Sequence, residues 1–119
     1  MNNEIKLDFD QARIKHMLFK SKLRSILYGS KTDEQPILDE RVCAVGKWLY
    51  GHALVKYSHI PEMQQLEKVH ANIHAAAREL LDLYHSGKEA EAREGLYKVN
   101  DIAAELVGLL DIIEAKVYS

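Results

Sequence analysis

Apolar residues recur at helical spacing along almost the whole of this 119-residue chain, and that periodicity limits its fold more than any other feature. In four stretches they are separated alternately by three and four positions, which places them on one face of an α-helix. No stretch shows the sustained alternation of a β-strand. Because such faces can only be buried against one another, the sequence predicts an all-α fold.

The four stretches predict three long helices and one shorter one. Short connections join them, so neighbouring helices should run antiparallel, and we expect an antiparallel four-helix bundle formed as a single domain over residues 1–119. Pro61 suits the first position of the third helix, and Gly29 and Gly87 suit helix ends. The expected limits, in chain order, are Phe9 to Gly29, Ile37 or Asp39 to Leu54, Pro61 to Gly87, and Ala92 to Val117.

The charge balance and hydropathy of the chain argue against two classes of partner. The formal net charge is -2 and the sequence pI is about 6.3, so there is no basic excess to neutralise the phosphates of a nucleic acid. No apolar run approaches the roughly 20 residues that a membrane span needs. The polar N-terminus lacks the layout of a secretory signal, and we expect a cytoplasmic protein.

Histidines stand where two of the predicted apolar faces would otherwise carry an aliphatic residue. His16 lies on the face of the first helix, and His70 lies on that of the third. His74 follows His70 by one turn, so both rings leave the same side of that helix. A buried imidazole needs a hydrogen-bond partner, and one metal ion would serve several rings at once.

Two interpretations of these residues stay open on periodicity alone. A single histidine on an apolar face is often a hydrogen-bonded core residue, and Cys43, the only cysteine, is ordinarily an inert buried thiol. With the three histidines, however, Cys43 would complete a four-coordinate set of the nitrogen and sulfur ligands that zinc prefers.

The residues around Cys43 resemble the chemoreceptor zinc-binding (CZB) domain family, in which a cysteine is followed by a small run and then Gly-Lys-Trp-Leu. The resemblance extends from about Asp8 to the end of the chain and is weakest in the last helix. Phe19 stands where the family usually has tryptophan. The motifs that carry the resemblance are Ala12 to His16, Arg41 to Gly51, Ile60 to Glu67, and His70 to His74.

The resemblance implies one zinc ion bound by His16, Cys43, His70 and His74 inside a four-helix bundle with an additional short helix. Four protein ligands leave no position for a catalytic water, so we expect no enzymatic activity. In this family the domain regulates an output such as a chemoreceptor signalling region or a diguanylate cyclase. Zinc and oxidants, including hypochlorous acid, are the inputs that the resemblance implies.

The sequence up to Ser119 contains no output domain, so we expect a stand-alone zinc or redox sensor. Such a sensor would act by homodimerisation or through a separate signalling protein of the chemoreceptor or diguanylate cyclase type. Two alternatives remain. One is an enzyme or oxygen carrier that uses a di-iron site, because Glu67-x-x-His70 is half of a di-iron carboxylate motif, although the second half is missing. A purely structural zinc in a scaffold bundle would also suit a closed four-ligand site.

Overall fold

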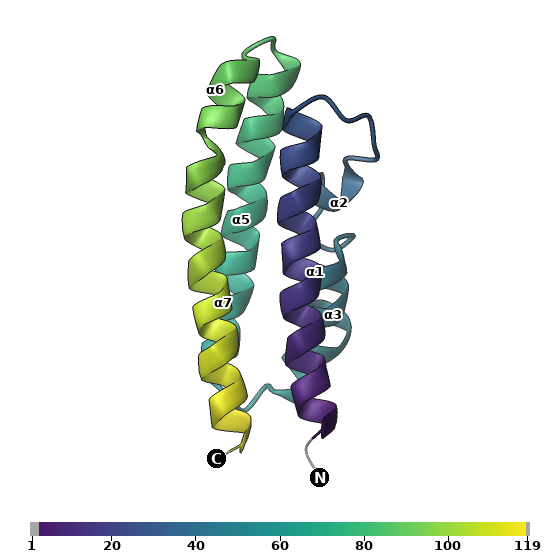
Figure 1. Cartoon of the computed structure of the whole chain (residues 1–119). Coiled ribbons are helices and arrows are strands. Elements are labelled where there is room, and N and C mark those ends of the chain that lie inside the picture. The colour runs from purple at the N-terminus through teal and green to yellow at the C-terminus, as the bar shows by residue number, and fades with distance from the viewer. Residues whose placement is uncertain (1–2, 119) are drawn as a thin grey trace.

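The computed structural model describes residues 3–118, which form helices and no β-strand. Four helical segments run alternately up and down, so the predicted all-α antiparallel bundle is confirmed, and both ends of the chain lie at the same end of the bundle (Figure 1). Its principal axes measure 50 × 21 × 18 Å. The segments are α1 (Asn3–Leu27), a composite helix over residues 44–56, α5 (Glu62–His85), and α6 (Glu89–Glu94) followed by α7 (Leu96–Tyr118).

The second segment differs from the prediction of one helix starting at Ile37 or Asp39. A short helix, α2 (Gln35–Leu38), ends just before Asp39, which is extended at φ -115° and ψ 112°. The Asp39 carboxylate accepts the backbone N–H of Arg41 at 2.9 Å, and this local bond competes with helical pairing. The helix resumes as α3 (Ala44–Trp48) and continues through a π-helical turn, η1 (Leu49–Ala53), into α4 (Leu54–Lys56).

The other helix limits differ by smaller amounts. α1 begins at Asn3, well before Phe9, and Pro61 precedes α5 as its N-terminal cap. Gly29 and Gly87 follow α1 and α5 with φ of +108° and +86°, the left-handed conformation that favours glycine at a helix end. The last segment, predicted as one helix, is interrupted at Gly95.

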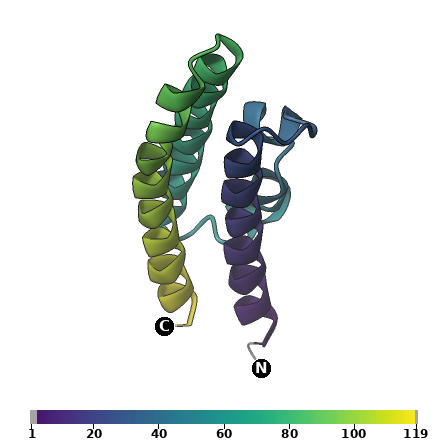
Figure 2. The ribbon, with the colours of Figure 1, turned by 45° about the horizontal axis from the view of Figure 1, so that its top comes forward.

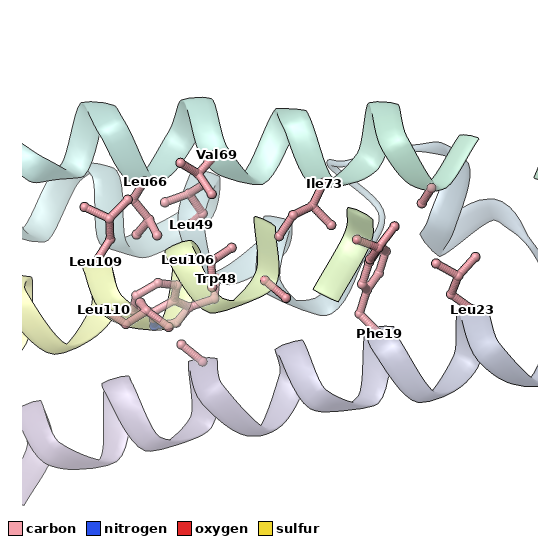
Figure 3. Close-up of a cluster of buried hydrophobic side chains, with 14 of the residues drawn as sticks. Phe19, Leu23, Trp48, Leu49, Leu66, Val69, Ile73, Leu106, Leu109 and Leu110 are labelled. Atoms are coloured by element: carbon pink, nitrogen blue, oxygen red, sulfur yellow. The ribbon is translucent and has the colours of Figure 1, made fainter. Parts of the chain in front are cut away.

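The apolar faces of the long helices meet in a continuous core, as the periodicity predicts. α5 packs along α7, and α1 contacts both α7 and α3 (Figure 2). Phe19 and Leu23 of α1 point toward α5, which carries Ile73, while Leu106 and Leu110 come from α7 (Figure 3). Each such side chain contributes roughly 1.5–3 kcal/mol when fully buried.

Within the described residues, no helix combines the length and the apolar composition that crossing a membrane would require.

Candidate metal centre

Three ligand-type side chains meet in the core between α3 and α5. His70 and His74 lie one turn apart on α5 and are 2% and 1% exposed. Cys43, just before α3, is also buried, and its Sγ lies 3.3 Å from Nε2 of each histidine. One ligand atom from each residue lies within 4.8 Å of the other two.

Cys43 is held in place by the helix that it caps. Its Sγ accepts the backbone N–H of Gly46 at 3.1 Å, so the first turn of α3 fixes the sulfur. Burial raises the pKa of the Cys43 thiol, while the backbone N–H groups of Gly46 and Val45 act in the opposite direction. Without a metal the sulfur is therefore a neutral thiol, which can donate to the Glu40 carbonyl at 3.5 Å.

The tautomer of His74 is set by a backbone contact. Its Nδ1 lies 2.8 Å from the Ile37 carbonyl oxygen, which can only accept, so Nδ1 carries the proton. The lone pair of the neutral ring is then on Nε2, which faces Cys43 Sγ. Metal-binding histidines are commonly oriented by such a bond to a backbone carbonyl. Phe19 packs against the same ring, with 4.8 Å between the ring centroids.

His70 and His16 each bury a ring nitrogen without a hydrogen-bond partner in residues 3–118. The unpartnered atoms are Nδ1 of His70 and Nε2 of His16, and both side chains are at most 3% exposed. Burial lowers the pKa of His70 to about 3, with further lowering by His74 and His16. It lowers the pKa of His16 to about 4, helped by Lys20. Both rings are therefore neutral at pH 7, as metal ligands must be.

These residues fit a zinc ion. Zinc bonds of about 2.3 Å to sulfur and about 2.0 Å to nitrogen at a tetrahedral angle would separate the two ligand atoms by about 3.5 Å. The observed 3.3 Å from Cys43 Sγ to each Nε2 is close to that value. The buried, unpartnered Nε2 of His16 is a further nitrogen in need of a partner.

Gly46 allows the backbone before α3 to approach this cluster. A Cβ at Gly46 would overlap the backbone carbonyl of Glu40 and would lie 3.3 Å from Cε1 of His70. The turn from Glu40 to Cys43 can therefore fold back over the start of α3 only because position 46 has no side chain.

The structure thus brings three of the four predicted ligands together: Cys43, His70 and His74. His16 is buried and influences the pKa of His70, but it lies outside this group, and its role as the fourth ligand stays a prediction. Glu67, the acidic half of the di-iron motif, is not in the group either. The only such group found among the described residues contains no carboxylate.

Helical periodicity does not indicate the role of Ile37, whose carbonyl orients His74 from α2. A backbone contact has no residue-type signature, although Pro36, inside the first turn of α2, could have indicated a separate short helix. The remaining three histidines lie outside this group. His52, His59 and His85 are all exposed.

Comparison with known protein families identifies the family of the chain that carries this cluster. The family model of the chemoreceptor zinc-binding domain matches residues 16–81, more than half of the chain. The chain belongs to the CZB family. No curated protein and no solved structure matches it. The matched CZB region begins at His16 and includes Cys43, His70 and His74.

Proposed function

We propose that this CZB domain is a zinc-dependent sensor in which Cys43 responds to zinc supply or to oxidants. His16, Cys43, His70 and His74 would hold the ion, which when bound keeps the cysteine sulfur deprotonated. The observation that carries the proposal is the double role of Cys43. Its sulfur caps α3 and also lies 3.3 Å from two histidines of α5.

This double role lets a chemical change at sulfur alter the arrangement of helices. Hypochlorous acid would oxidise the Cys43 thiolate by two electrons, forming an S–O bond as the O–Cl bond breaks and chloride leaves, which gives the sulfenic acid. The added oxygen removes the sulfur from its place between α3 and α5. A group that bridges two helices in one state and not in the other is what a two-state switch requires.

We further propose that the output is a change in contact with a partner, either a second copy of this chain or a separate signalling protein of the chemoreceptor or diguanylate cyclase type. A non-enzymatic role is supported by the family description, which names a chemoreceptor domain. The cysteine and two histidines of the cluster suit zinc better than a di-iron centre, which is built largely from carboxylates.

The first test is the metal content of the purified chain, measured by native mass spectrometry for the wild type, Cys43→Ala and His59→Ala. His59 is an exposed histidine outside the cluster, so its variant is the matched control. We expect one zinc per chain in the wild type and the control, and a weakened or lost ion in Cys43→Ala. Full zinc binding by Cys43→Ala would refute the proposal.

A second measurement separates a sensor from a structural scaffold. Zinc is removed with a chelator, and the chain is followed by circular dichroism and hydrogen exchange. A sensor stays folded, with exchange increased around residues 35–48, whereas global unfolding indicates a structural ion. Adding hypochlorous acid should release zinc from the wild type and oxidise Cys43. The Cys43→Ala variant lacks this sulfur, so oxidation at position 43 should be absent from it.

A further inference from the structure

A groove in the surface reaches Cys43 of the cysteine–histidine cluster. It has a volume of about 290 Å³ and lies between α1 and the segment from α2 to α3, with Leu18 and Val42 on opposite sides. Cys43 lines it, together with Phe19 and Ile37. Both of the latter contact His74, one through its ring and the other through its carbonyl. The groove therefore leads from solvent to the Cys43 side of the cluster, with Phe19 and Ile37 between it and His74.

The charged groups that line this groove are all positive. Lys15 and Lys22 of α1 and Lys47 of α3 are its only charged lining residues. None of the three forms an ion pair with a residue in the described part of the chain, so their charges are not neutralised by a neighbour. Asp39 and Glu40 lie near Cys43 but do not line the groove.

Unpaired cations around a recess with apolar walls raise the local concentration of anions. Such focusing increases association rates by about 10- to 1,000-fold in favourable cases and weakens as salt screens the charges over about 10 Å. A neutral reagent of the same size gains nothing from it. The groove should therefore select reagents for Cys43 by their charge.

We propose that this groove is the entrance to Cys43 and that it favours small monoanionic oxidants, such as a hypohalite or a peroxy-acid anion. This rests on the proposed function in one respect, because the natural reagent is taken to be an oxidant. With hypochlorite, the sulfur of the thiolate forms an S–O bond as the O–Cl bond breaks. Chloride leaves with the electron pair, and the cysteine becomes a sulfenate.

The test uses two alkylating reagents that differ in charge and share a reacting carbon and leaving group. Iodoacetate is an anion and iodoacetamide is neutral. In each case the Cys43 sulfur displaces iodide from the CH₂ carbon as the S–C bond forms. Rates are measured by intact mass on the zinc-loaded and the metal-free full chain, at low and high salt.

The key variant replaces Lys15, Lys22 and Lys47 with glutamine. Its matched control replaces three lysines that do not line the groove, Lys31, Lys68 and Lys98, so the net charge of the two variants is identical. We expect the ratio of the iodoacetate rate to the iodoacetamide rate to fall by about 3- to 10-fold in the groove variant, and much less in the control. High salt should lower the ratio in the wild type and in the control, which keep the groove lysines, and should change it little in the groove variant.

Two results would overturn the proposal. One is an equal change of the rate ratio in both lysine variants, which would mean that only net charge matters. The other is a wild-type rate ratio that high salt leaves unchanged, which would mean that the groove lysines do not attract the anionic reagent. Neither result bears on zinc binding, which the Cys43→Ala comparison tests independently. Equal melting temperatures of the two variants would show that folding is not the cause of a difference.

Discussion

Acidification should destabilise the metal-free protein well above the pH at which its carboxylates titrate. The folded-state pKa is about 4 for His16 and about 3 for His70, against an ordinary value of 6.5. Because the folded pKa values are lowered, both rings are neutral in both states above pH 6.5 and affect stability little there. Below pH 6.5 the unfolded chain binds protons that the folded chain does not, so stability falls.

The size of the loss follows from these pKa values. At pH 5 each ring is still neutral in the folded state, whereas the same histidine in the unfolded chain is protonated. Because pH 5 lies 1.5 units below the ordinary pKa of 6.5, each histidine lowers the free energy of unfolding by about 2 kcal/mol. His16 and His70 together give about 4 kcal/mol, and His74, whose pKa burial also lowers, adds in the same direction. This is a large share of the 5–15 kcal/mol typical of a domain.

Urea unfolding of the metal-free chain, followed by circular dichroism at several pH values between 7.5 and 5, measures this loss. The pKa values of Asp8 and Glu62 are lowered from 3.8 and 4.5, so these carboxylates affect stability only below this interval. His16→Leu should remove about 2 kcal/mol of the pH dependence, and the exposed His59→Gln should leave it unchanged. A free energy of unfolding that stays the same from pH 7.5 to pH 5 would refute the reasoning.

Two further predictions concern single substitutions. Gly46→Ala should lower the free energy of unfolding by about 1–3 kcal/mol and weaken zinc binding, because the new methyl group overlaps the Glu40 carbonyl. The control is Gly51→Ala, whose new methyl group would have nothing within 4 Å and should be neutral or stabilising by up to about 1 kcal/mol. Chemical denaturation and zinc titration of both variants check this, and equal effects would contradict it. Tyr57→Phe removes the 2.6 Å hydrogen bond to the Asp8 carboxylate and should cost about 1–3 kcal/mol with zinc content unchanged, as measured by denaturation and native mass spectrometry.

Helical periodicity predicted the fold and the placement of the histidines, because both depend on which face of a helix a residue occupies. His16, His70 and His74 are all buried on the faces where the spacing places them. The break before α3 could not be predicted in this way. Val42 continues the apolar spacing of the second segment, yet it is 38% exposed, since the chain leaves the helix between Leu38 and Ala44.

The detailed geometry of the site depends on contacts that sequence patterns do not record. The interaction of the Ile37 carbonyl with His74 and the cap that Cys43 forms on α3 both require the break over residues 39–43. Had the helix continued through this stretch, the sulfur would project from a helix side instead of capping a helix N-terminus. The error in the predicted helix limit therefore concealed the feature on which the proposed switch depends.

The packing around Cys43 restricts where a product of oxidation can be placed. On one side of the cluster, the Glu40 carbonyl and Cε1 of His70 lie against Gly46. A methyl group added at Gly46 would overlap the Glu40 carbonyl. On another side, Sγ faces the two imidazoles at 3.3 Å. The groove between α1 and α3 is the open space that Cys43 lines. An oxygen added to the sulfur would therefore either enter that groove or push α3 away from α5, and in the second case the sulfur leaves its place between the two histidines.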